Sequence, residues 1–117
     1  MMKGDFMIRV RFRQLEGGGW LTVSGHAGAA PRGEDLVCAA ASMLVYSLAQ
    51  AVLELGERGL LKEAPEVRIL PGEAVIAAVA SDEGLRELRQ SFRVARLGFQ
   101  LLGESYPGNV DLVKNAY

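Results

Sequence analysis

The sequence predicts a single α+β domain of two layers, in which an antiparallel-rich sheet and two helices follow in the order ββαββα. Three observations lead to this prediction: segments that alternate apolar and polar residues, a long segment without charge, and a later segment with apolar residues at helical spacing. The chain has 117 residues, half of them apolar. A single hydrophobic core without disulfides is therefore expected.

The strands are predicted by period-two alternation. Residues 6–13 alternate apolar residues with arginines, which is typical of a half-buried strand. Glycines 17–19 predict a hairpin loop before a second strand at 20–24, and Pro71-Gly72 predicts a turn between two later strands. These later strands, with a short one at the end, are expected at 67–70, 74–80 and 110–113.

The first helix is predicted from Asp35, as its N-cap, to about Leu55, with Gly56 and Gly59 closing it. Residues 36–53 carry no charge, a length close to the roughly 20 residues of a membrane span. Four polar side chains interrupt this stretch: Ser42, Tyr46, Ser47 and Gln50. We therefore expect no membrane span but a buried helix that a second copy partly covers, which makes the protein a homodimer.

The second helix is predicted over about 83–102, with Ser81 or Asp82 as its cap and with Gly103 and Pro107 ending it. Apolar residues recur along it every three or four positions. They are Leu85, Leu88, Phe92, Ala95, Phe99 and Leu102.

Composition excludes several classes of function. The formal net charge of −1 gives no reason to expect a general nucleic-acid binder or a membrane-surface protein. One cysteine cannot form an internal disulfide, and one histidine with one cysteine cannot hold zinc without carboxylates. We expect no metal, no cofactor and a reduced, cytoplasmic setting.

The amino terminus shows no secretory signal, because no basic region precedes an apolar run. The first patterned segment begins beside Met7, which could be the biological start. Residues 1–6 would then be an extension or a start-site choice, and residues 7–117 the single domain.

Cys38 is the first candidate for chemistry. With Asp35 as N-cap it is the third helical residue, where unpaired amides and the helix dipole favour a thiolate. The other interpretation is a small buried hydrophobe, which is the usual fate of a lone cysteine.

His26 is the second candidate. It follows the second strand and opens a glycine-rich loop over 27–34, and Cys38 lies at the far end of that loop. A cysteine and a histidine need only mutual reach to act as nucleophile and base. Alone, such a histidine is more often solvated. In the alternation of the strand, His26 shares a face with Trp20, Thr22 and Ser24. Trp20 could therefore help to line a pocket beside His26, although packing in the core or an interface is the simpler role.

Two further residues could support the pair. Ser42 lies one helical turn after Cys38 and could bond the sulfur or the imidazole, or else the carbonyl of Cys38. Asp35 could cap the helix or orient His26. These two roles compete, and a cap bonded to the Cys38 amide would withhold that amide from an oxyanion.

Arg9, Arg11 and Arg13 form a basic row on one face of the first strand. Such a row more often faces solvent or protects an edge than docks a partner. It could also meet a ribosomal or RNA surface, although we do not expect direct RNA binding.

At these residues the sequence resembles a known family. The segments Gly25-His26-Ala27-Gly28 and Asp35-Leu36-Val37-Cys38-Ala39-Ala40-Ala41-Ser42 resemble the signature of the bacterial ribosomal-processing cysteine proteases, the Prp family. The opening Met7-Ile8-Arg9-Val10 and the later Ser105-Tyr106-Pro107 resemble the family as well.

This resemblance implies a homodimeric cysteine endopeptidase with His26 and Cys38 as its catalytic dyad. The family removes a short N-terminal extension from the twenty-seventh large-subunit ribosomal protein, cutting after an aromatic residue. Backbone amides of Cys38 or Ala39 would receive the oxyanion. The loop with Gly28, Pro31 and Gly33 would be mobile and would cover the site when substrate binds.

Two alternatives compete with this prediction. One is a non-enzymatic ribosome-assembly or RNA-binding module that uses the arginine face and needs no reactive thiol. The other is a peptide-binding dimer that has lost catalysis. The rate at which iodoacetamide labels Cys38 would separate them, because a structural cysteine reacts slowly.

Overall fold

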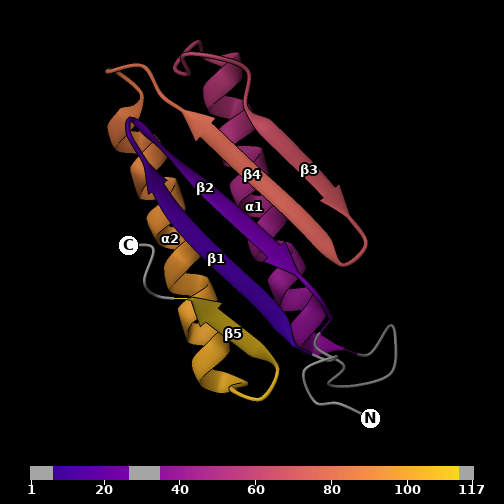
Figure 1. Ribbon diagram of the computed structural model, residues 1–117. Coiled ribbons are helices and arrows are strands. Elements are labelled where there is room, and N and C mark those ends of the chain that lie inside the picture. Colours follow the sequence, from indigo (N-terminus) through magenta and orange to yellow (C-terminus); the bar gives the residue numbers. More distant parts are fainter. Residues whose placement is uncertain (1–6, 27–34, 114–117) are drawn as a thin grey trace.

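The computed structural model describes residues 7–26 and 35–113 (Figure 1). The expected extension at 1–6 and the expected mobile loop at 27–34 lie outside the described residues. The elements are β1 (Ile8–Leu15), β2 (Gly18–Ser24), α1 (Leu36–Glu57), β3 (Glu66–Leu70), β4 (Glu73–Val79), α2 (Leu85–Ser105) and β5 (Val110–Val113). The predicted order ββαββα, with a short strand after the second helix, is confirmed.

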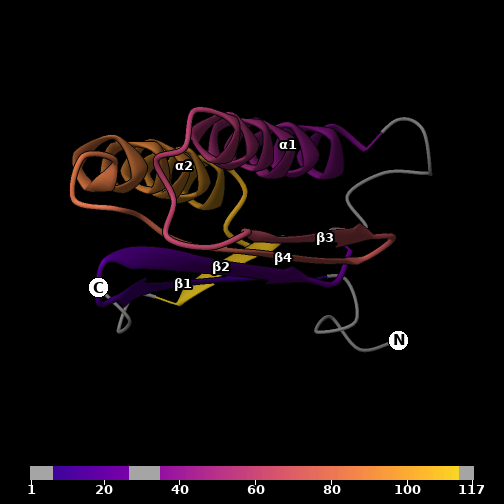
Figure 2. The same cartoon turned by 90° about the horizontal axis from the view of Figure 1, so that it is seen from above.

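The strands form one five-stranded sheet in the order β3-β4-β2-β1-β5. Neighbouring strands are antiparallel except for β5, which runs parallel to β1. Both helices cover the same face of the sheet, as Figure 2 shows in the view from above. The predicted two-layer α+β architecture is therefore confirmed, and within residues 7–26 and 35–113 no helix covers the other face of the sheet.

The core lies between the sheet and the helices. The alternation in β1 turns Ile8, Val10 and Phe12 toward the helices, where all three are buried. On α2 the predicted apolar stripe contributes four buried residues, and the ring of Phe99 meets that of Phe12 edge-on at 6.0 Å between centroids. Each fully buried side chain of this size stabilises the fold by roughly 1.5–3 kcal/mol.

The predicted glycine loop is wrong in its extent. The turn between β1 and β2 consists of Glu16 and Gly17, while Gly18 and Gly19 already belong to β2. A Cβ on Gly19 would lie 2.9 Å from the ring of Phe92. Glycine at this position therefore lets α2 pack closely on the strand.

For α2 the predicted cap and the predicted end at Gly103 are also wrong, whereas Pro107 directly follows the C-cap, Tyr106, as predicted. The N-cap of α2 is Gly84, which makes no side-chain cap, and the hydroxyl of Ser81 instead donates to the carbonyl oxygen of Leu60 at 3.0 Å. The helix continues through Gly103 to Ser105. At the end of α1, Gly56 lies inside the helix and Arg58 is the C-cap, but Gly59 closes the helix as predicted, with φ +73° directly after the cap.

Helix α1 is long and apolar enough to cross a membrane by length and composition, and it is the one such helix among the described residues. In the fold, a row of its side chains packs on the sheet. The row consists of Val37, Ala41, Val45, Leu48, Ala49, Val52 and Leu55. About a third of its most apolar window is buried inside the domain (33%), so much of its apolar surface faces outward.

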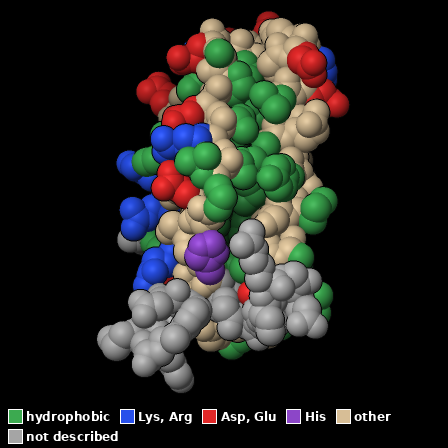
Figure 3. Space-filling view, turned by 90° about the vertical axis from the view of Figure 1, so that its right-hand side faces the viewer, with side chains coloured by type: hydrophobic (Ala, Val, Ile, Leu, Met, Phe, Trp, Pro, Cys, Tyr) green, Lys and Arg blue, Asp and Glu red, His purple; other side chains and the backbone are tan. Residues whose placement is uncertain are grey.

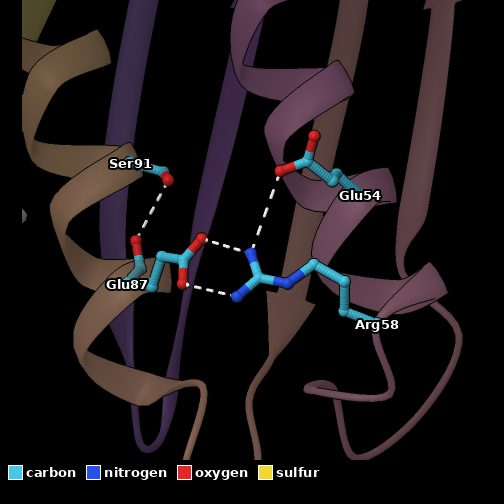
Figure 4. A network of polar contacts seen from close by, with 4 residues as sticks. All are labelled: Glu54, Arg58, Glu87 and Ser91. Atoms are coloured by element: carbon cyan, nitrogen blue, oxygen red, sulfur yellow. Dashed lines mark hydrogen bonds and ion pairs between the residues drawn. The ribbon is translucent and has the colours of Figure 1, made fainter.

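A polar contact joins the end of α1 to the start of α2 (Figure 4). The guanidinium of Arg58 donates to both carboxylate oxygens of Glu87, at 2.6 and 3.1 Å, and lies 3.8 Å from Glu54. The hydrogen bonds from Arg58 lower the pKa of Glu87, and the same bonds raise the pKa of Arg58. Both side chains are exposed.

Candidate active site

A cavity of about 320 Å³ lies where the first half of α1 faces the turn between β3 and β4. Both His26 and Cys38 line this cavity, which we call the site cavity. Its other walls come from α1, from the two strands of the β3–β4 hairpin and from the sheet. They are Ile8, Val23, Gly25, Ala41, Ser42, Val45, Tyr46, Ile69, Leu70, Pro71, Gly72, Glu73 and Ala74.

Cys38 is the third residue of α1, as the sequence predicts, and its side chain is half-buried. The Asp35 carboxylate accepts a hydrogen bond from the Cys38 amide at 3.0 Å. Asp35 therefore caps the helix, which was one of its two predicted roles. The Ala39 amide donates to the carbonyl oxygen of Asp35 at 3.1 Å, so both amides predicted to receive an oxyanion already have acceptors.

His26 reaches the site cavity because β2 ends at Ser24 and the chain then turns. Gly25 has φ +96°, a conformation that glycine adopts readily, and its amide donates to the carbonyl oxygen of Gly72 at 2.9 Å. A side chain on Gly25 would meet the carbonyl oxygen of Met7. The turn takes His26 out of the strand alternation and into the cavity, and its side chain is exposed (Figure 3).

Trp20 does not line the site cavity, so its predicted pocket role is wrong. It lies on the open face of the sheet, opposite Arg13 in the pairing of β1 with β2. The guanidinium of Arg13 lies 4.7 Å from the Trp20 ring centroid, which is cation–π distance.

Gly72 is a site residue that the sequence reasoning missed. It is the second residue of the predicted Pro71-Gly72 turn and has φ +74°. A Cβ built on it would lie 2.7 Å from Nε2 of His26, so the imidazole rests directly against this glycine. The sequence identified the turn, but no local signal in it indicates which side chain lies on the turn.

Ser42 lines the site cavity and is exposed. Its hydroxyl makes no hydrogen bond with any residue in the described part of the chain, in contrast to Ser91, which donates to the Glu87 carbonyl oxygen at 3.0 Å. None of the three partners predicted for Ser42, the sulfur, the imidazole and the Cys38 carbonyl, is therefore engaged. The acidic residue of the cavity wall, Glu73, pairs with Arg68 at 3.3 Å.

The imidazole of His26 makes no hydrogen bond with Cys38 or with any other residue of 7–26 and 35–113. Within the same ranges, no cluster of three histidine, cysteine, aspartate or glutamate side chains could hold a metal ion. The chemistry that the cavity offers comes from a thiol at a helix N-terminus and from a nearby imidazole.

A thiol and an imidazole in one cavity, with the thiol at the start of a helix, are the functional groups of a cysteine hydrolase. The model of the family described as cysteine protease Prp matches residues 7–111. The chain belongs to this family and is a cysteine protease. The resemblance predicted from the two sequence motifs is confirmed, and a non-enzymatic module is excluded.

Solved structures agree with this assignment. The ribosomal processing protease Prp of S. aureus, crystallised with a covalently linked product peptide, is 27% identical, with a TM-score of 0.72 over 91% of this chain and 97% of that chain. A second structure of S. aureus Prp, with a substrate peptide, is 24% identical (TM-score 0.67, 92% and 98% covered). The protein SMU.848 of Streptococcus mutans is also 24% identical (TM-score 0.67, 95% and 96% covered). A comparison with curated proteins gave no match.

Proposed function

We propose that this protease removes the short N-terminal extension of the twenty-seventh large-subunit ribosomal protein, with Cys38 as nucleophile and His26 as acid and base. The observation that carries the proposal is that both residues line one cavity although separate elements supply them. The similarity to S. aureus Prp, a ribosomal processing protease solved with a covalently linked product peptide, supports this class of substrate.

The reaction has two stages. The Cys38 thiolate attacks the scissile carbonyl carbon and forms a C–S bond, after which the C–N bond breaks and the His26 imidazolium protonates the leaving amine. Water then attacks the thioester while His26 accepts its proton. The C–S bond breaks, the product leaves as a carboxylic acid, and the Cys38 thiolate and His26 imidazolium are restored.

The start of α1 supports the anionic states of this reaction through the helix dipole. The Cys38 amide can donate to an oxyanion only if the oxyanion shares or replaces the Asp35 carboxylate, which now accepts this bond. Asp35 therefore acts by fixing the first turn. Ser42 has its hydroxyl available in the cavity, where it can bond substrate or water.

The apolar wall of the site cavity suits a hydrophobic or aromatic residue before the scissile bond. Val45 and Tyr46 of α1 and Ile69 and Leu70 of β3 all line the cavity. An aromatic side chain placed among them would lose roughly 150–250 Å² of contact with water. This wall supports cleavage after an aromatic residue.

A homodimer is the second part of the proposal. Apolar side chains cover the outer face of the helices, with Leu36 73%, Met43 63% and Leu101 64% exposed. A shallow groove of about 390 Å³ between α1 and α2 runs through the same surface and is lined by Met43, Leu44 and Leu101, among others. A second copy of the chain that covers this face would remove its apolar side chains from water. We further propose that the enzyme is cytoplasmic and needs no cofactor.

The test uses peptides that carry the extension and the first mature residues of the host's ribosomal protein. We expect the purified protein to cut after the aromatic residue, as mass spectrometry of the two fragments would show, and Cys38→Ser to leave the peptide intact. A peptide that stays intact with the wild-type enzyme, while other peptides are cut, would overturn the substrate assignment.

A further inference from the structure

We infer that Gly72 is a positioning residue for the catalytic base: the β3–β4 turn acts as a seat that fixes the imidazole of His26 in the site cavity. This inference rests on the proposed role of His26. It concerns a residue far from both sequence motifs, and it gives a defined place to an exposed histidine that makes no hydrogen bond to any described residue.

The contact is specific to the imidazole. The three atoms nearest to a Cβ built on Gly72 all belong to His26, with Nε2 at 2.7 Å, Cε1 at 3.0 Å and Cδ2 at 3.6 Å. Real Cβ contacts are not shorter than about 3.0 Å, so any other residue at this position displaces the ring. The absence of a side chain on Gly72 is therefore what gives the ring its place.

The backbone of the same turn holds the chain that carries His26. The carbonyl oxygen of Gly72 accepts the Gly25 amide at 2.9 Å, one residue before the histidine. Gly25 and Gly72 both have positive φ, of +96° and +74°. One residue of the turn thus anchors the backbone beside His26 and also supports its ring.

The molecule contains a matched control for this inference. Gly17 is the second residue of the two-residue turn between β1 and β2, with φ +74°, the same as Gly72. A Cβ on Gly17 meets only the side chain of Val79, at an ordinary 3.6 Å. Substitution at Gly17 therefore introduces the same backbone strain without touching the imidazole.

The experiment compares Gly72→Asn with Gly17→Asn, because asparagine tolerates positive φ better than other residues that carry a Cβ. We expect Gly72→Asn to lower kcat about tenfold to hundredfold, since displacement of a catalytic group by about 1 Å has effects of this size. KM for the extension peptide should change little, and Gly17→Asn should retain wild-type kcat. Equal kcat in the two variants would overturn the inference.

Two measurements keep the inference independent of folding and of the proposed function. His26 is the single histidine of the sequence, so its ring resonances are unambiguous in an NMR spectrum. The wild-type protein should show an NOE between the ring and the α-protons of Gly72. The absence of this NOE would contradict the inference that Gly72 positions the ring, even if Gly72→Asn does not fold. A wild-type enzyme with this NOE in which His26→Ala keeps full activity would instead refute the dyad.

Discussion

The two helices lie side by side on one sheet but differ in what their sequences provide. Helix α1 has a side-chain cap on its first turn, contributes Cys38 and Ser42 to the site cavity, and bears no charged residue from 36 to 53. Helix α2 has no side-chain cap, and its exposed positions are rich in arginine. Its buried stripe alone accounts for its position.

This difference separates residues that serve function from residues that serve folding. A helix packed on one sheet requires a polar outer face, and α2 fits that description up to Arg93, whereas Val94 and Leu101 farther along it are exposed. Helix α1 departs from it at its first turn and on its outer face. We assign the first departure to catalysis and the second to a partner copy, and the predictions below test each assignment.

The largest expected effect is at the first turn of α1 and its partner histidine. Cys38→Ser and His26→Ala should each abolish peptide cleavage, by at least about a hundredfold for the histidine, since general acid–base catalysis contributes that much or more. Circular dichroism should show an unchanged fold because neither side chain is part of the buried core. Full activity in either variant would contradict the dyad.

The next effect concerns the outer face of α1. Met43→Glu places a charge in the proposed dimer interface and should weaken the dimer about tenfold or more, because an unpaired buried charge is costly. Arg86→Gln on α2 changes the net charge by the same amount at another exposed position and should leave the dimer intact. Light scattering at micromolar concentration measures both. A wild-type monomer at that concentration would refute the interface.

A smaller effect is expected from the cap. Asp35→Ala removes the acceptor of the Cys38 amide and should lower the free energy of unfolding by about 1 kcal/mol. Asp82→Ala, at the residue that the sequence suggested as a cap for α2, should change it by less than about 0.5 kcal/mol, because the structure gives that helix no side-chain cap. Urea denaturation measures both values. Equal decreases in the free energy of unfolding for the two variants would contradict the claim that only α1 has a side-chain cap.

The smallest effect is expected at the contact between the helices, since exposed ion pairs contribute little to stability. Arg58→Gln removes the group that lowers the pKa of Glu87. The contribution of the pair is present above the ordinary glutamate pKa, about 4.3, and is lost as pH falls through the lowered value in the folded protein. The free energy of unfolding should therefore be larger for wild type than for Arg58→Gln at pH 7, and this difference should disappear below about pH 4. A difference that does not change with pH would mean that Arg58 contributes through packing and not through its charge.

The sequence predicted what local patterns determine. Alternation placed the strands of both hairpins, apolar spacing placed the stripe of α2, and Asp35 was recognised as a cap because its side chain bonds three residues ahead. The pair of Cys38 and His26 was proposed because they are the single residues of their types and flank one loop, and both line the site cavity.

The sequence could not predict what depends on tertiary packing. Nothing near Gly19 indicates that Phe92 will pack over it, and nothing near Gly72 indicates that His26 will rest on it. In the sequence, the apolar residues that line the cavity cannot be distinguished from residues of the hydrophobic core. The predicted oxyanion donors were named from helix position alone, which does not reveal that the cap and the helix already use them.

The central claim is that His26 activates Cys38, and the most direct measurement is the rate of Cys38 alkylation by iodoacetamide as a function of pH. Cys38 is the single cysteine of the chain, so mass spectrometry counts its reaction without ambiguity. We predict that the wild-type protein reacts with an apparent pKa well below the ordinary thiol value of about 8.5, and that His26→Ala shifts the profile up toward that value. Identical profiles in the two proteins would contradict the account.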